Sequence, residues 1–503
     1  MEIQIQYLIL QTKYLRPNTN TEMKNLRHIL LLLAGIAFAT ACTDDFDEMN
    51  QDPNRATEIQ NAPYLLLTPM QKRAVTKILD EAWSGGNLNA QYAAKIVFTD
   101  YDLYNWGSNS GIWNDLYKSA REAQTLETIA PEGYKVISKI MKVWSFQQLT
   151  DLYGDIPYSE ALKAKSEANY APKYDSQQSI YTELVKELKE ANQLLKQTYA
   201  PVQGDVINDS DFGKWRKLSN ALLLRVYMRM SEVNPSAAEA GIKEIVGNAS
   251  EYPLLASNAD NSVLKYGTTG PDAAPHTKES GSREGSFDEY RMSETLEGVL
   301  RDLDDPRMAR WFRPTAKSLQ DGTPEFSGMK NGMADGVAYS YKGGSLNLSR
   351  FAPLFFDEPN TVQGIMMTYS EQEFILAEAA QRGWVSGGET HYNNAVTASF
   401  DYWKVTIPAD YLQRDKVKWD NSLERVMKQK WLSNMLNGFE GFSDYRRTGF
   451  PTEITPGPDA VYDYVPFRYE YPQKEQSLNE ANYNAAVSTQ GADQVTTKIW
   501  WIK

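Results

Sequence analysis

The side chains of this sequence best suited to recognise another molecule are aromatic rings set among short polar residues. Tyrosine, tryptophan and phenylalanine make up 12% of the chain. Tyr101, Tyr104, Trp106 and Trp113 all lie within residues 100–113, where most other positions are Asp, Asn, Ser or Gly. Flat ring faces stack on the C–H faces of sugars, and polar groups beside them hydrogen-bond to sugar hydroxyls. The spacing therefore predicts a saccharide-binding surface.

Two other segments could complete that surface. Trp83 begins a Trp-Ser-Gly-Gly-Asn sequence that is typical of a loop. Arg283, Phe287, Tyr290 and Arg291 fall close together further along the chain and are predicted to form a facing wall. The alternative is that these rings only hold loops against a hydrophobic core, and the sequence leaves both interpretations open.

The single cysteine, Cys42, has the surroundings of a lipid-attachment site. A basic segment and a short apolar run, residues 29–38, precede the small residues Ala-Thr-Ala just before it. The run is about half of the ~20 residues needed to span a bilayer, and the pattern is typical of a bacterial lipoprotein signal. We therefore predict a mis-started upstream extension over 1–22 with Met23 as the true start, a signal peptide over 23–41 and a lipidated acidic tether over 42–55.

The composition excludes several classes of chemistry. The chain has 52 basic and 65 acidic residues, a formal charge of −13, which disfavours binding to nucleic acid. One cysteine and three histidines exclude a disulfide scaffold, a cysteine-rich zinc site and an iron–sulfur cluster. The sequence carries no phosphate-binding loop, dinucleotide fingerprint or serine-nucleophile elbow. We predict no catalytic residue, no metal and no cofactor. A helical glycan hydrolase stays the competing class, since it needs only two carboxylates about 6.5–9.5 Å apart.

The elements that position these residues are predicted to be helices. Apolar residues recur at three- and four-residue spacing, the period of an amphipathic helix. Asp175, Ser370 and Asp420 are expected to cap the N-termini of three of them. The predicted helices cover residues 134–149, 175–195, 214–231, 293–303, 370–382, 392–403 and 420–437.

Three short features are predicted to brace these helices. Residues 151–158 are interpreted as a helix end, in which Gly154 permits a positive φ. Residues 445–447 are predicted to form an internal polar brace. Arg225 and Arg229 lie in the most apolar of the helices and therefore need carboxylate or carbonyl partners.

The middle of the chain differs from the rest in composition and in hydrophobic periodicity. Gly, Pro, Ser and Asn become frequent between about 250 and 365, and helical periodicity is mostly lost there. Long irregular segments of this kind are functional or disordered. Because no clear linker divides the chain, we predict a single helical domain over 56–503 with a loop-rich insertion at about 250–365.

Ordered short motifs give the chain a resemblance to a known family. It resembles the SusD/RagB nutrient-binding outer-membrane lipoproteins of Bacteroidetes, and most closely their SusD-like branch. Each motif alone is weak, but their order and spacing together are specific. The motifs occupy residues 47–54, 151–158, 172–177, 214–220, 305–307, 377–379, 382–384, 445–449 and 471–476, followed by Asn479 and the pair Trp500 and Trp501.

The resemblance implies a fold and a role. It implies a mainly α fold of degenerate tetratricopeptide-type helix pairs with an irregular, loop-rich second layer. It also implies a lipid-anchored protein at the cell surface of the outer membrane, which performs no chemistry. Such proteins hold an oligosaccharide, or in some members a peptide, and pass it to a SusC-like TonB-dependent barrel. Peptide or another nutrient, a hydrolase, and a structural or adhesive lipoprotein remain alternatives, because no motif identifies the ligand.

Overall fold

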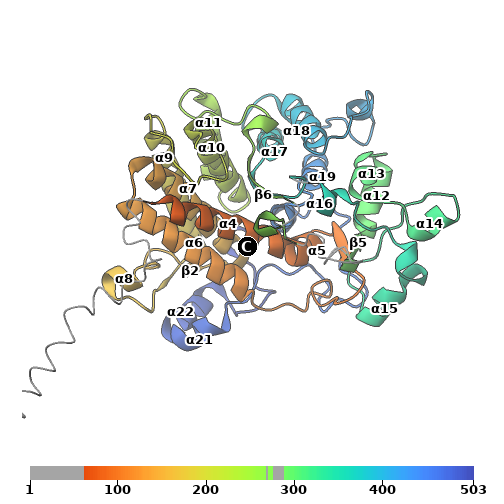
Figure 1. Cartoon of the computed structure of the whole chain (residues 1–503), viewed down its shortest axis with the longest axis horizontal. Coiled ribbons are helices and arrows are strands. Elements are labelled where there is room, and N and C mark those ends of the chain that lie inside the picture. The colour runs from red at the N-terminus through yellow and green to blue at the C-terminus, as the bar shows by residue number, and fades with distance from the viewer. Residues whose placement is uncertain (1–61, 268–269, 276–287, 359, 503) are drawn as a thin grey trace, which may run out of the picture. The chain divides into compact units, whose positions relative to one another are not determined.

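Amphipathic helices account for most of the described chain, as the hydrophobic spacing predicts (Figure 1). The computed structural model describes residues 62–267, 270–275, 288–358 and 360–502. The longer helices are α4 (Tyr64–Glu81), α6 (Ser110–Ile129), α7 (Glu132–Tyr153), α9 (Gln177–Leu194), α10 (Phe212–Arg229), α11 (Pro235–Gly247), α17 (Tyr369–Gln381), α18 (Gly388–Tyr402), α19 (Leu423–Ser433), α20 (Gly438–Thr448) and α22 (Glu480–Gln490).

Shorter elements fill the spaces between these helices. Among the described residues, no helix is both long and apolar enough to cross a membrane. The short helices are α5 (Asn87–Asn89), α8 (Ala164–Glu167), α12 (Glu294–Asp302), α13 (Arg307–Trp311), α14 (Ala316–Gln320), α15 (Asp335–Ser340), α16 (Leu354–Asp357) and α21 (Gln473–Leu478), and the strands are β1 (Ala93–Lys95), β2 (Ile156–Pro157), β3 (Tyr174–Asp175), β4 (Ser262–Lys265), β5 (Tyr290–Met292) and β6 (Gln363–Met367).

Successive helices pack against one another as pairs. Helix α6 packs on α7, α9 on α10, α10 on α11, and α17 on α18, with α19 against α17 (Figure 1). Helix α9 buries one apolar stripe, whereas α7, α10 and α17 are buried on most sides, and stacking of neighbours joins these surfaces into a continuous core. The prediction of a mainly α fold built from helix pairs is therefore confirmed.

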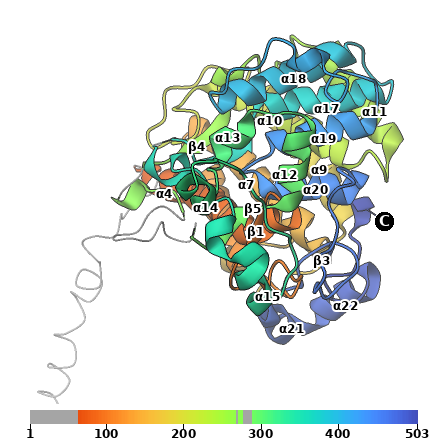
Figure 2. The same cartoon turned by 90° about the vertical axis from the view of Figure 1, so that its right-hand side faces the viewer.

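The loop-rich part predicted at about 250–365 carries only short helices and strands. Helix α12 begins after Ser293, whose hydroxyl accepts the N–H of Leu296, as the sequence predicts for 293–303. Three two-stranded antiparallel sheets tie segments that are distant in sequence: β1 to β5, β2 to β3, and β4 to β6. Figure 2 shows β1 and β5 side by side, with Ala93 opposite Met292.

The predicted cap of α9 is wrong by one residue. The hydroxyl of Ser176 accepts the N–H of Ser179 and caps the helix. Asp175 lies in β3 instead, where its carboxylate accepts the backbone N–H groups of Tyr158 and Ser159 at 3.1 and 2.7 Å. A carboxylate already bonded to the facing turn is not available to the helix end.

Two other predicted caps are wrong for a similar reason. Thr368, not Ser370, caps α17, because the Ser370 hydroxyl is buried and donates to the carbonyl of Ala395 at 2.7 Å. Ser422, not Asp420, caps α19, and Asp420 accepts the N–H of Ser422 itself. Helix periodicity locates these helices well, but tertiary contacts decide which hydroxyl is free to cap them.

The predicted braces are confirmed. Gly154 ends α7 with a φ of 85°, a conformation that favours glycine. Arg446 is buried and donates to the carbonyls of Asp151 and Phe467 at 2.9 and 2.6 Å. This side chain therefore ties the end of α7 to the C-terminal segment.

Arg225 and Arg229 of α10 have the carboxylate partners that their burial requires. Arg225 donates to both oxygens of Glu371, at 2.7 and 2.8 Å, and Arg229 lies 2.5 Å from Glu440. All four side chains are at most 5% exposed. Because an unpaired buried charge is costly, these pairs fix how α17 and α20 lie against α10.

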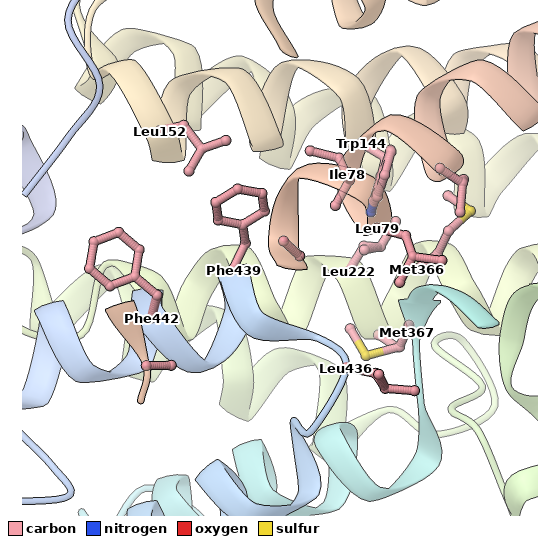
Figure 3. Close-up of a cluster of buried hydrophobic side chains, with 14 of the residues drawn as sticks. Ile78, Leu79, Trp144, Leu152, Leu222, Met366, Met367, Leu436, Phe439 and Phe442 are labelled. Atoms are coloured by element: carbon pink, nitrogen blue, oxygen red, sulfur yellow. The ribbon is translucent and has the colours of Figure 1, made fainter. Parts of the chain in front are cut away.

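The hydrophobic core joins the helix pairs to the C-terminal part of the chain. Figure 3 shows buried side chains from helices and from a strand that lie far apart in sequence. They come from α4, α7, α10, β6, the segment before α20, and α20: Ile78, Leu79, Trp144, Leu152, Leu222, Met366, Met367, Leu436, Phe439 and Phe442.

Candidate functional site

The loop that carries the predicted rings is held by a buried carboxylate. Asp102 is 3% exposed and accepts the backbone N–H of Lys95 at 2.8 Å and Nδ2 of Asn331 at 2.6 Å. The backbone N–H of Thr99 in turn donates to Asp335 at 2.9 Å. Residues 98–107 are therefore clamped between β1 and the loop-rich part of the chain.

The environment of Asp102 disfavours its charged form. Burial raises the pKa of this carboxyl to about 7, although the bonds from Lys95 and Asn331 act in the opposite direction. The Asp102 carboxyl therefore gains or loses its proton near neutral pH.

The rings of this loop form a partly covered stack. Tyr101 stacks on Trp106 with ring centroids 6.4 Å apart and an angle of 12°, and Trp106 contacts Tyr469 at 4.7 Å. Tyr101 is half-buried, whereas Trp106 and Tyr104 are buried. Tyr101 is thus the ring of this group that is most open to a ligand.

The phenol of Tyr101 stays neutral at physiological pH. Burial, followed by the nearby carboxylate of Glu81, raises the pKa of Tyr101 to about 12. A neutral phenol both donates and accepts a hydrogen bond, which suits a sugar hydroxyl.

A second loop, residues 457–470, lies beside the first. The backbone N–H of Val461 donates to the carbonyl of Leu103 at 2.9 Å, and that of Glu470 to Gly107 at 3.4 Å. We call these two loops, 98–107 and 457–470, the two-loop surface.

The second loop carries its own row of rings. Tyr462 stacks on Tyr464 at 6.0 Å, and Tyr464 stacks on Phe467 at 5.5 Å with an angle of 19°. Tyr464 is 40% exposed, so its ring is accessible. Sequence reasoning missed these rings, although the high tyrosine and proline content of residues 451–472 was a signal that could have found them.

Two glycines allow the segments around this surface to meet. A Cβ on Gly457 would lie 1.9 Å from the carbonyl oxygen of Asn331, and Gly332 on the facing segment has a φ of 66°. Backbones approach this closely only where side chains are absent. The contact sets the position of the second loop.

The structure buries several residues predicted to contact a ligand. Trp83 is 1% exposed and packs edge-to-face on Tyr290 and Phe351 at 5.7 and 5.1 Å. Tyr290 is 2% exposed, and Arg291 donates to the carbonyl of Tyr290 at 2.7 Å. Their burial favours the alternative that these groups hold loops to the core. Trp113 is buried in the same way, on Tyr153.

Three predicted sites lie outside the described residues. They are the wall residues Arg283 and Phe287 and the lipid-attachment residue Cys42. Within the part of the chain that the structure describes, the predicted rings brought to one surface are therefore Tyr101, Tyr104 and Trp106. Contact of any of these residues with ligand stays a prediction.

Comparison with known families gives one match that spans most of the chain. The family model of SusD-like proteins, described as starch-binding and associating with the outer membrane, matches residues 53–472. The search of curated proteins found no match.

Solved structures share the fold. An outer membrane protein from Bacteroides vulgatus, described in connection with nutrient binding, is 29% identical and has a TM-score of 0.75, with 88% of this chain and 100% of that chain covered. A chitin-binding protein is 28% identical with a TM-score of 0.74, covering 88% of this chain and 99% of that one. A SusD homologue from Bacteroides fragilis is 27% identical with a TM-score of 0.73 over the same shares.

Proposed function

Because the chain belongs to the SusD-like family of outer-membrane nutrient-binding proteins, we propose that it captures an oligosaccharide at the cell surface and passes it to a SusC-like TonB-dependent transporter. The proposal also makes Cys42 the site of the lipid anchor. It assigns the protein a binding role in which the glycan leaves intact.

The observation that carries this proposal is the two-loop surface. Tyr464 is exposed and pairs with the rings of Tyr462 and Phe467, next to the loop that holds Tyr101. Stacked rings at a surface offer flat apolar faces, and the phenols and nearby amides supply hydrogen bonds. Such a surface matches the alternating C–H faces and hydroxyls of a sugar chain. The chitin-binding relative at 28% identity supports a glycan as the class of ligand.

Calorimetry on the full-length protein, purified from membranes in detergent, tests the capture step. The ligands are soluble oligomers of starch and chitin, with short peptides as the comparison. We expect a glycan to bind and to be recovered uncleaved. Tyr464→Ala should weaken binding by about twofold to tenfold, since one stacked ring typically contributes about 0.5–1.5 kcal/mol. The matched control is Tyr170→Ala, because Tyr170 is 77% exposed on a different part of the chain.

Several results would contradict this proposal. If peptides bind and no glycan does, the ligand is a peptide and not an oligosaccharide. Shortened glycan products would indicate a hydrolase. Equal losses of glycan affinity in Tyr464→Ala and Tyr170→Ala would show that the two-loop surface does not bind the glycan.

The transport role has its own test. Affinity purification of the full-length protein from native outer membranes should bring down a TonB-dependent barrel at near-equal amounts. A protein recovered alone under these mild conditions would contradict the role of transporter partner.

A further inference from the structure

A polar cavity shares no lining residue with the two-loop surface. Its volume is about 460 Å³, within the roughly 300–1,000 Å³ typical of ligand sites. The segment before α10, the paired strands β4 and β6, and the end of α18 surround it. Helix α10 contacts both strands, so the cavity walls belong to the rigid part of the fold.

This cavity continues into two neighbours. A cavity of about 390 Å³ shares Asn258, Ala259 and Asp401 with it, and another of about 240 Å³ shares Lys265. We call the three together the polar groove. Cavities that share walls in a row suit an elongated ligand of several units better than one small molecule.

Two residues that line the central cavity each have a buried N–H donor without a partner among the described residues. Asn208 is 4% exposed; its Oδ1 accepts the hydroxyl of Ser262 at 3.0 Å, but its Nδ2 has no partner among the described residues. Nε1 of Trp403, which is 2% exposed, likewise has none in the described structure. Buried N–H groups without acceptors are costly, so a small side-chain shift that brings either N–H to an acceptor oxygen of a ligand would stabilise it.

The charges of the groove add further donors. Lys214, Lys265 and Lys404 line the central cavity, and none forms an ion pair with any described residue. Two acidic residues, Asp209 and Asp401, line it as well. Cationic and N–H donors therefore outnumber the acidic groups, although the whole chain carries a charge of −13. A negative protein repels polyanions in general, so any polyanion that binds must do so at a local cationic site.

The remaining wall suits a sugar. The phenol of Tyr402 donates to Oε1 of Gln363 at 3.0 Å, which fixes one ring beside a side-chain amide. Asn360 and Lys404 have positive φ values of 60° and 54°. Non-glycine residues adopt this conformation at a cost, and such positions cluster where a site must be shaped.

We propose that the polar groove binds an acidic oligosaccharide, whose carboxylate or sulfate groups lie against Lys214, Lys265 and Lys404 and whose oxygens accept from Asn208 and Trp403. The inference rests on the proposed capture of oligosaccharide and names the class of glycan. It places a second contact region on the protein, separate from the two-loop surface.

Binding to three polymers tests the groove, again with the full-length protein in detergent. Polygalacturonate carries carboxylates, dextran sulfate carries sulfates, and dextran is the neutral control. The test variant is Lys214→Gln/Lys404→Gln, in which both changed side chains lie at the cavity mouth and are not buried. The matched control is Lys317→Gln/Lys416→Gln, since both lysines are more than half exposed elsewhere.

We expect one acidic polymer to bind more tightly than dextran, with an affinity that falls as salt rises. The groove variant should lose about tenfold in affinity for it, and the control variant should lose about twofold or less. Binding of polygalacturonate would indicate that the groove recognises carboxylates, and binding of dextran sulfate would indicate sulfates.

Two outcomes would overturn the groove proposal. They are equal affinity of the groove and control variants for the acidic polymers, and acidic polymers that bind no better than dextran. If neutral glycans still bind and depend on Tyr464, the capture function stands while the groove proposal fails. If no glycan of any kind binds, both fail together.

Discussion

Arg447 and Glu378 form a bidentate ion pair in the core, although 69 positions separate them in the sequence. The two Nη–Oε distances are 2.6 and 2.7 Å, and neither side chain is exposed to solvent. Burial alone would raise the pKa of Glu378, but Arg447 outweighs it and lowers that pKa. The pair ties α17 to α20, the helix that precedes the second ring-bearing loop.

Arg447→Met should therefore destabilise the protein strongly. The change leaves the Glu378 carboxylate buried without its main partner, and the expected loss is about 3–5 kcal/mol. Chemical denaturation monitored by circular dichroism measures it. The control is Lys317→Met, which breaks a half-exposed pair with Asp321 and should cost less than about 0.5 kcal/mol. Similar losses in the two variants would contradict the structural role of Arg447.

Trp106→Ala separates a binding role from a packing role. Trp106 is 7% exposed and supports Tyr101 on one side and Tyr469 on the other. We expect a loss of about 3–5 kcal/mol in stability, typical of a buried ring, together with weaker glycan binding. Thermal unfolding and calorimetry measure the two effects. Unchanged affinity would assign Trp106 to the core alone, and unchanged stability would contradict its burial.

The raised pKa of Asp102 predicts a pH dependence of stability. The folded-state pKa of about 7 lies above the ordinary value of 3.8, so the native state binds this proton more tightly than the unfolded state. The resulting stabilisation is complete below about pH 4 and is lost as the pH rises through 7. It amounts to about 4 kcal/mol, taking about 1.4 kcal/mol for each pH unit between 3.8 and about 7.

Asp102→Asn removes the titrating group and isolates this contribution. The stability of the wild-type protein should fall more steeply between pH 5 and pH 7.5, about the pKa window, than that of the variant. Parallel pH profiles of the two proteins would show that Asp102 has an ordinary pKa.

Gly457→Ala tests the close backbone contact beside the two-loop surface. A Cβ there would lie 1.9 Å from the carbonyl oxygen of Asn331, so the second loop has to move. We expect lower stability and weaker glycan binding, although no ring is removed. Gly298→Ala is the matched control, because nothing lies within 4 Å of a Cβ on this helical glycine. That control should gain about 0.5–1 kcal/mol. A fully stable Gly457→Ala protein with normal affinity would contradict the role of this contact.

Cys42→Ala tests the proposed lipid anchor. Without acyl chains the protein should move from the membrane fraction to the soluble fraction, because about 0.8 kcal/mol is lost for each methylene no longer buried in lipid. Fractionation after a high-salt and detergent-free wash measures this. Persistence in the membrane of cells that lack the partner barrel would contradict lipidation at Cys42.

The sequence alone determined the elements and their chemical needs. Helical period marks α9, which buries one stripe that repeats every three to four residues, and a nearly continuous apolar run marks α10, which is buried on most sides. It also determined that Arg225 and Arg229 need carboxylate or carbonyl partners, because a charge in an apolar helix cannot stay unpaired. The ring-rich segment 100–113 could also be recognised from the sequence, because its aromatic residues are neighbours in the chain.

Only the tertiary structure decided which rings face solvent and what lies beside them. Trp83 and Tyr101 both lie in polar, loop-like sequence, yet packing buries the first and leaves the second partly open. Tyr464 reaches the two-loop surface because a backbone hydrogen bond from Val461 to Leu103 holds the two loops together. The polar groove likewise gathers residues from 72 to 404. Contacts between distant segments depend on how whole helices pack, and no local spacing encodes them.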